Sequence, residues 1–317
     1  MFKFFPMSPE RRAVIDIGTN SIKLLVGEVS GRYVKPLWEE SEQTRLGKGF
    51  YETHRLQSEA IGATAHFAAQ FAKLAQTYGV ASTRIIATSA ARDALNQAEF
   101  IGAIEKSSGL KVDIIPGEQE ANLAYRGVTS EPGLAGQRLL IMDCGGGSTE
   151  FILGEGDRVE FAQSFQLGTV RLQERFQPSD PPTPAELGQC RQWLRDIFTT
   201  EIRPGLEPVL GNGRERTRLV GTGGSAAILA RMENAVKGYH RAEIEAARLT
   251  VERVRQRVDS LWGLMLSDRK RLIGLPKKRA DVILFGAAIY EASMQELGFA
   301  ELQASTRGLR YAAMLDE

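Results

Sequence analysis

The sequence predicts an α/β protein built from two related lobes with a cleft between them. Two observations indicate this class: short apolar strands alternate with helical stretches, and one strand–turn–strand pattern occurs twice. The length of 317 residues agrees with two domains of about 150 residues, each large enough to bury its own core. A hydrophobic fraction of 43% and a charged fraction of 25% exclude a disordered chain.

The first half of the chain is expected to begin with a strand hairpin and to continue as strand–helix units. Residues 57–78 carry apolar side chains at helical spacing and end near Gly79, which indicates a long helix. We expect strands at 13–16, 21–29, 85–88 and 112–115, and helical segments at 90–96, 100–105 and 118–128.

The second half is expected to repeat this alternation, so that both faces of each sheet are covered. Residues 131–137 contain Pro and Gly and are the best candidate linker. We expect strands at 139–143 and 149–153 and one that ends at 219–220, a Pro-rich loop at 178–184, a helix at 185–197 and further helices to about residue 300.

The internal repeat is a strand that runs into an Asp-x-Gly-x-x-Ser turn and then into a second apolar strand. Residues 13–21 and 140–148 both follow this pattern, with a constant separation of 127 residues. Gly and Ser are common in unrelated turns, but their match in register with Asp favours a duplicated lobe. The matched positions are Asp16, Gly18 and Ser21 in the first copy and Asp143, Gly145 and Ser148 in the second.

Each turn suits a phosphate group, because glycines let the backbone approach an anion and consecutive N–H groups point inward. An aspartate beside phosphate requires a counter-charge, and Mg²⁺ prefers carboxylate oxygens. Asp16 and Asp143 are therefore expected to face one metal–phosphate from the two lobes, with Glu150 as a third carboxylate. The alternative is that one of the aspartates only caps a turn.

Three other segments carry candidate groups. Residues 221–226 fit a weak dinucleotide-binding pattern but more plausibly form a loop that meets phosphate, sugar or base at a helix N-terminus. Arg92 suits a phosphate fork or a local ion pair. Glu118 and Glu120 fit either the favoured first turn of a helix or a base that activates water.

Several function classes are disfavoured. A net charge of +1 argues against a nucleic-acid binder, although the basic segment 248–279 suits either a solvated helix face or a polyanion groove. No apolar run is long enough for a membrane span, and the start of the chain does not resemble a signal peptide. Three scattered histidines and no GxSxG motif disfavour zinc and serine hydrolases. Two cysteines, Cys144 and Cys190, indicate a reducing compartment.

Together these motifs closely resemble the exopolyphosphatase / guanosine pentaphosphate phosphohydrolase family, in the superfamily of actin, sugar kinases and heat-shock chaperone ATPases. The two glutamate-bearing segments are the specific ones, because sugar kinases and actins share the Asp-Gly turns but lack this set. The resemblance covers essentially the whole chain and rests on residues 16–21, 88–94, 117–121, 143–150, 221–225 and 279–283.

The resemblance implies two ribonuclease-H-like lobes, at residues 1–128 and 129–299, with residues 300–317 packing back on the first lobe. It implies a cytoplasmic, Mg²⁺-dependent phosphoanhydride hydrolase. The implied substrates are inorganic polyphosphate, which loses its terminal phosphate, or guanosine pentaphosphate, which loses its 5′-terminal phosphate. It also suggests a homodimer, without a nucleic-acid or membrane partner.

The resemblance also implies roles for individual residues. Glu120 is the general base on water, Asp143 and Glu150 are the carboxylates for metal and phosphate, and Arg92 holds the transferred phosphoryl group. The expected phosphate-binding residues are Thr19, Asn20, Ser21, Gly145, Gly146, Gly147, Ser148, Gly223, Gly224 and Ser225.

The chain departs from the family pattern in two respects. Asn122 stands where family members often have arginine, and Arg126, four residues later, is a candidate substitute. Longer members carry additional C-terminal helical domains, so strong processivity on very long chains is not expected here. Two alternatives remain: a guanosine tetra- or pentaphosphate sensor with little turnover, and a kinase or ATPase of the same superfamily.

Overall fold

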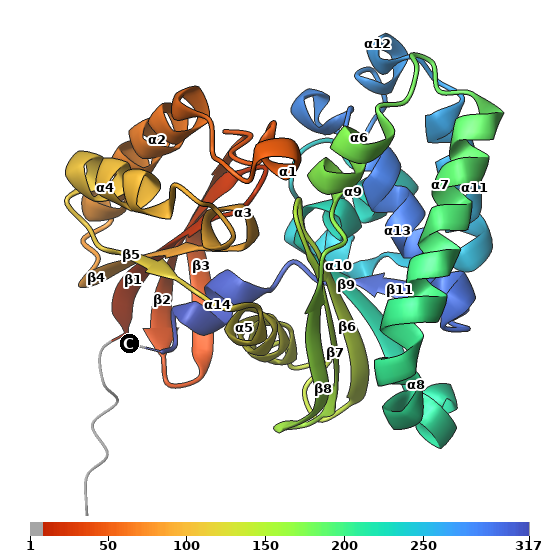
Figure 1. The fold of residues 1–317 in the computed structure, drawn as a ribbon. Coiled ribbons are helices and arrows are strands. Elements are labelled where there is room, and N and C mark those ends of the chain that lie inside the picture. The colour runs from red at the N-terminus through yellow and green to blue at the C-terminus, as the bar shows by residue number, and fades with distance from the viewer. Residues whose placement is uncertain (1–8, 317) are drawn as a thin grey trace, which may run out of the picture. The chain divides into compact units, whose positions relative to one another are not determined.

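A computed structural model describes residues 9–316 (Figure 1). The described chain forms two compact units: unit 1 consists of residues 9–116 and 309–316, and unit 2 of residues 117–308. Residues 1–6, whose sequence does not resemble a signal peptide, lie outside the described residues.

Unit 1 contains a five-stranded sheet with the strand order β3-β2-β1-β4-β5. The strands β1, β2 and β3 form an antiparallel meander, and β4 and β5 continue the sheet parallel to β1. The strands span Glu10–Ile17 (β1), Ile22–Ser30 (β2), Tyr33–Glu42 (β3), Ser82–Ala87 (β4) and Val112–Ile114 (β5).

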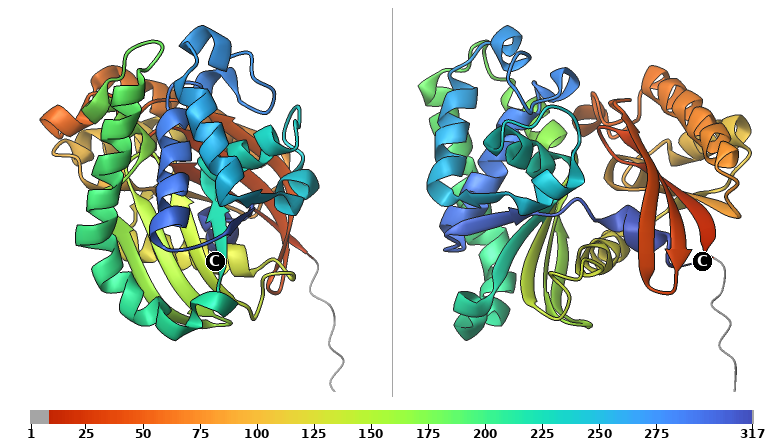
Figure 2. Two further views of the ribbon diagram at one scale, coloured as in Figure 1. Left: turned by 90° about the vertical axis from the view of Figure 1, so that its right-hand side faces the viewer. Right: turned by 180° about the vertical axis from the view of Figure 1, so that it is seen from behind.

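Helices cover both faces of this sheet. Alternate residues of β1, among them Ile15 and Ile17, pack with Ala68 and Phe71 of α2, and Figure 2 shows α2 and α4 on the same side of the sheet. On the other face α14 lies against β1, and Arg310 donates a 2.8 Å hydrogen bond to the carbonyl of Leu24 on the neighbouring strand β2. The helices span Phe50–Thr53 (α1), Ser58–Thr77 (α2), Ser89–Arg92 (α3), Gln97–Ser108 (α4) and Leu309–Ala313 (α14).

Unit 2 contains a six-stranded sheet with the order β10-β11-β9-β6-β7-β8. Five of its strands, in the order β8-β7-β6-β9-β11, repeat the order of unit 1 with the same parallel or antiparallel sense at each pairing, and β10 is added antiparallel at the edge. The strands span Arg138–Cys144 (β6), Thr149–Glu155 (β7), Arg158–Phe165 (β8), Arg218–Thr222 (β9), Arg248–Thr250 (β10) and Glu301–Ala304 (β11).

The duplication extends to a local irregularity. The pairing of β2 with β3 shifts register between Val26 and Gly27, and the pairing of β7 with β8 shifts between Leu153 and Gly154, which again lie 127 residues further along. A shared bulge at a shared offset is not expected of two unrelated hairpins. The predicted two-lobed α/β class is therefore confirmed.

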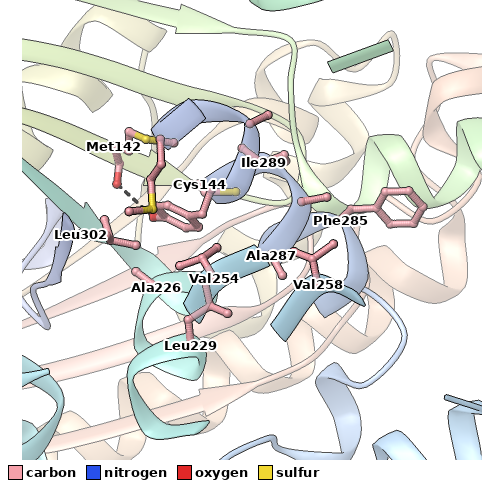
Figure 3. Packing of buried hydrophobic residues seen from close by; sticks show 14 of the residues in the cluster. Met142, Cys144, Ala226, Leu229, Val254, Val258, Phe285, Ala287, Ile289 and Leu302 are labelled. Atoms are coloured by element: carbon pink, nitrogen blue, oxygen red, sulfur yellow. Dashed lines mark hydrogen bonds between the residues drawn. The ribbon is translucent and has the colours of Figure 1, made fainter. Parts of the chain in front are cut away.

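One face of the second sheet is covered by a thick helical layer, in which α7, α13 and α11 lie beside one another (Figure 2). Figure 3 shows Met142 and Cys144 of β6 packed with residues of α9, α11 and α13. The helices of this layer span Pro184–Ile197 (α7), Phe198–Ile202 (η1), Arg203–Leu210 (α8), Gly223–Glu233 (α9), Val251–Trp262 (α11) and Ile283–Glu296 (α13).

The opposite face of this sheet packs against α5 (Gly117–Thr129), where Ala121, Ala124 and Tyr125 contact Ile141 and Ile152. The shorter elements of unit 2 span Thr169–Phe176 (α6), Gly211–Arg216 (η2), Arg241–Ala246 (α10), Leu266–Arg269 (α12) and Lys277–Arg279 (η3).

These units differ from the boundaries expected at residues 128 and 299. Because α5 packs on β6, β7 and β8, unit 2 begins at Gly117, and the candidate linker 131–137 lies inside it. Because β11 pairs with β9, the chain leaves unit 2 only after Gly308. In the part of the chain that the structure describes, no helix combines the length and apolar character that crossing a membrane requires.

Candidate active site

The turn after β6 is held by backbone hydrogen bonds on one side. The Gly145 N–H donates to the Ser148 carbonyl at 2.9 Å, and the first N–H groups of α6 cover the turn: Thr169 donates to the Gly145 carbonyl at 3.0 Å and Val170 to the Gly146 carbonyl at 2.8 Å. The Gly147 carbonyl accepts from Arg171 Nε at 3.0 Å.

These contacts orient the N–H groups of the turn. In a trans peptide the N–H points opposite to the preceding carbonyl. Because the carbonyls of Gly145, Gly146 and Gly147 face α6, the N–H groups of Gly146, Gly147 and Ser148 point away from it. Three consecutive N–H groups directed to one side make a concave site for an anion.

The close approach of α6 depends on Gly168. A Cβ atom at this position would overlap the backbone of Gly146 and Gly147, so no side chain fits. Unit 1 has the same arrangement, since a Cβ at Gly47 would overlap the Thr19 side chain, and Gly47 N–H donates to the Thr19 carbonyl at 2.8 Å. Both glycines follow a buried leucine, but Leu-Gly pairs also occur elsewhere in the sequence, so the pair alone does not identify them.

Three carboxylates gather beside the turn of unit 2. Along β6, Leu139, Ile141 and Asp143 face α5, since alternate residues of a strand share a face. Glu150 lies directly opposite Asp143 on β7 and therefore shares that face. Glu120 lies in the first turn of α5, the helix that covers it.

The electrostatics of Glu150 show that these groups interact. Its side chain is buried, and burial raises its pKa well above the usual value, with further contributions from Glu120 and then Asp143. The Ser164 hydroxyl donates a 2.6 Å hydrogen bond to Glu150 Oε1 and partly offsets this effect. A cation beside the three carboxylates would offset it further.

The donor set fits a hard divalent cation. Among residues 9–316 no group of three or more His, Cys, Asp or Glu side chains is arranged to hold a metal ion by itself. Mg²⁺ commonly uses only one or two carboxylates and completes its shell with water and phosphate oxygens. Asp143 and Glu150, paired across two strands, meet that requirement.

The turn of unit 1 has the same backbone and different side chains. Gly18 N–H donates to the Ser21 carbonyl at 3.0 Å, as in the second copy. Asp16, expected as a metal carboxylate, has Lys23 Nζ at 3.6 Å from its Oδ2. The Asn20 Oδ1 accepts from Gln43 Nε2 at 3.0 Å, and the buried Asn20 Nδ2 has no acceptor among the described residues.

Arg92 lies close to this turn. Thr19 Oγ1 accepts a 3.3 Å hydrogen bond from the Ala90 N–H of α3, and Arg92 is the last residue of that helix. The Arg92 Nη1 donates to the Ile115 carbonyl at 3.3 Å, and its Nε lies 3.4 Å from Asp93 Oδ1. The guanidinium is thereby anchored at the carboxyl ends of β4 and β5.

The loop after β9 adds a second glycine-rich segment to unit 2. Gly223 has φ of +82° and lies so close to Asp143 Oδ1 that a Cβ would overlap it. A Cβ on Gly224 would overlap Arg279 Nη2, so this guanidinium also reaches the loop. Ser225, in the first turn of α9, is buried.

Unit 2 therefore brings together most of the expected groups, namely Glu120, Asp143, Gly145, Gly146, Gly147, Ser148, Glu150, Gly223, Gly224 and Ser225. Unit 1 brings together Asp16, Thr19, Asn20, Ser21 and Arg92. Sequence reasoning missed Lys23, Gly47, Ser164 and Gly168 as site residues, and included Arg279 only as part of a motif.

The basic segment 248–279 shows extensive local pairing. Arg253 Nε lies 2.9 Å from Glu233, and Arg248 and Arg271 also have carboxylate partners. These contacts agree with a solvated helix face.

The duplicated sheets and the paired phosphate turns, with carboxylates beside one of them, define a two-lobed phosphate-handling protein of the α/β class. The family model described as the Ppx/GppA phosphatase family matches residues 24–317, and the chain belongs to that family.

Individual relatives agree with this assignment. The chain is 34% identical over 303 residues to Exopolyphosphatase 2 of Mycobacterium tuberculosis, with 92% of each chain covered. The structure of the Aquifex aeolicus PPX-GPPA enzyme is 29% identical and has a TM-score of 0.78, with 98% of this chain and 100% of that chain covered. An exopolyphosphatase from Cytophaga hutchinsonii is 27% identical, with a TM-score of 0.85 and 97% and 98% coverage.

Proposed function

We propose that this protein is an exopolyphosphatase, a phosphoanhydride hydrolase that releases the terminal phosphate of inorganic polyphosphate. The observation that carries the proposal is the group of three carboxylates, Glu120, Asp143 and Glu150, beside the glycine-rich turn of unit 2. Membership of the Ppx/GppA phosphatase family and the 34% identity to Exopolyphosphatase 2 support the choice of substrate.

Each carboxylate has a proposed role. Asp143 and Glu150 hold Mg²⁺, which when bound neutralises charge on the phosphate oxygens. Glu120 acts as the general base, because it lies on the helix that covers these carboxylates. We assign the metal to this copy because Asp16, the corresponding aspartate of unit 1, already has a lysine partner.

Two sets of groups are proposed to bind phosphate oxygens. In unit 2 the donors are the N–H groups of Gly146, Gly147 and Ser148 and those of the loop after β9, at Gly223, Gly224 and Ser225. Gly145 shapes the site, because its N–H closes the turn on the Ser148 carbonyl. In unit 1 the donors come from Thr19, Asn20, Ser21 and Arg92.

The reaction needs little from the protein besides positioning and charge. Water attacks the terminal phosphorus and passes a proton to Glu120, while the bond to the bridging oxygen breaks and the shortened chain leaves. The N–H groups of the turn stabilise the charge on the transferred phosphoryl group.

Finer parts of the proposal rest on the sequence resemblance. They are dependence on Mg²⁺, guanosine pentaphosphate as a second substrate, a cytoplasmic location, assembly as a homodimer, and the absence of a nucleic-acid partner.

The test is phosphate release, with Mg²⁺, from medium-chain polyphosphate, guanosine pentaphosphate and ATP measured in parallel. We expect release from polyphosphate that stops when the metal is chelated. Release from ATP only in the presence of an acceptor would indicate a kinase. No release from any of the three, with tight binding of guanosine tetraphosphate, would indicate a sensor.

A further inference from the structure

We propose that Lys23 is a built-in cation of the first turn, so that unit 1 binds a phosphate group without a metal and only unit 2 takes a divalent cation. The inference deepens the proposed function and rests on it. It assigns a role to a lysine that the sequence resemblance did not single out.

The argument starts from the register of the two sheets. In unit 1 a row of directly opposed residues crosses β1, β2 and β3 as Asp16, Lys23 and Ser41. In unit 2 the equivalent row crosses β6, β7 and β8 as Asp143, Glu150 and Ser164. The outer residues are identical in the two rows, and the middle residue changes from Lys to Glu.

The exchange changes the charge that each row presents. Lys23 Nζ lies 3.6 Å from Asp16 Oδ2, so the first row contains its own counter-ion. The second row contains two carboxylates, and Glu120 adds a third. A divalent cation is attracted by the second row but repelled by the ammonium group of the first.

An independent observation indicates that the first turn binds an anion. The side chain of Asn20 is buried, with 5% exposed, and its Nδ2 donor has no acceptor among the described residues. Gln43 Nε2 donates to its Oδ1, which leaves Nδ2 as the end of the amide without a partner among the described residues. A buried donor without an acceptor is costly, and a phosphate oxygen would satisfy it.

The test is a count of bound Mn²⁺ by the loss of its free paramagnetic resonance signal, in the full-length protein without substrate. We expect one Mn²⁺ in the wild type and two in Lys23→Glu, because this substitution gives the first row the two carboxylates of the second. Lys23→Met removes the ammonium without adding a ligand and should bind one. Lys73→Glu, with the same charge change on the exposed side of α2, is the matched control and should bind one.

The outcomes separate this inference from the proposed function. Binding of a single ion by folded Lys23→Glu, or of two ions by the wild type, would overturn the role of Lys23. No Mn²⁺ bound by the wild type would instead contradict the metal site of the proposed function.

If Lys23→Glu does not fold, the steady-state kinetics of Lys23→Met test the inference instead. We expect KM for polyphosphate to rise about tenfold, with an unchanged Mg²⁺ concentration at half-maximal rate, because a lost charge-assisted contact weakens phosphate binding. An unchanged KM, or a shifted Mg²⁺ requirement, would contradict the inference.

Discussion

The turn after β1 and the turn after β6 share their internal hydrogen bond, the glycine that packs on them and the bulge in the next pair of strands. They differ in the charges placed beside this common backbone. The first has an aspartate–lysine pair, and the second has two opposed carboxylates with a third on α5.

The comparison shows how little is needed to change the chemistry of a phosphate turn. In the proposed function the backbone N–H groups of both copies bind an anion. The second copy adds acidic side chains that suit a metal and a base. We therefore expect substitutions in unit 2 to affect turnover and metal dependence, and substitutions in unit 1 to affect substrate affinity.

The largest expected effect is that of Glu120→Gln. The amide keeps the shape of the side chain but does not accept a proton, so turnover should fall by about 10²–10⁴-fold while polyphosphate binding remains. Glu118→Gln, an exposed position in the same first turn of α5, is the matched control and should keep its activity. Undiminished phosphate release by Glu120→Gln would remove Glu120 from the mechanism.

The next effect is on the metal. Glu150→Gln removes one of the two opposed carboxylates, and the Mg²⁺ concentration for half-maximal phosphate release should rise at least about tenfold. Glu155→Gln, at the far end of β7, provides the control. Equal Mg²⁺ requirements in wild type and Glu150→Gln would place the metal elsewhere.

Substitutions in the turn of unit 1 are expected to change the affinity for polyphosphate. Asn20→Asp replaces the unsatisfied Nδ2 donor by a carboxylate oxygen, and KM for polyphosphate should rise by about tenfold or more, with kcat little changed. Asn20→Ala loses the donor without adding charge and should give a smaller rise. A fall in kcat at unchanged KM would contradict the division of roles between the copies.

The smallest expected effect concerns stability. Gly168→Ala would place its methyl group into backbone atoms, whereas Gly47→Ala would place it against a side-chain methyl group of Thr19. We expect the free energy of unfolding in urea to fall by about 2–3 kcal/mol in the first variant and about 1 kcal/mol in the second. Gly188→Ala, in an open position on α7, is the control. Equal losses in both glycine variants would show that the two turns pack alike.

Much of this fold follows from local sequence patterns. The helix expected at 57–78 is α2, and the 127-residue repeat corresponds to two sheets of one topology. The strands β3 and β8 were not predicted, because both are edge strands of mixed polarity without an apolar run. The strand β10 has three residues and lies in a stretch expected to be helical.

The residues of the candidate site could be predicted where they lie close together in the sequence. They could not be predicted where the register of paired strands brings them together. The turns and Glu120 stand in short motifs. Ser164 and Lys23 reach the candidate site because they lie opposite Glu150 and Asp16 on neighbouring strands. Which residues lie opposite one another depends on the strand pairing. The second hairpin is shorter than the first, so the two Leu-Gly pairs are 121 residues apart instead of 127. A comparison at the constant offset of 127 residues therefore does not align them.

The most direct test of the central claim, that the two turns differ in metal binding, is a crystal soaked in Mn²⁺ and measured at the manganese absorption edge. We predict one anomalous peak, beside Asp143 and Glu150, and none beside Asp16. A peak beside Asp16 and Lys23, alone or together with the first, would contradict the account.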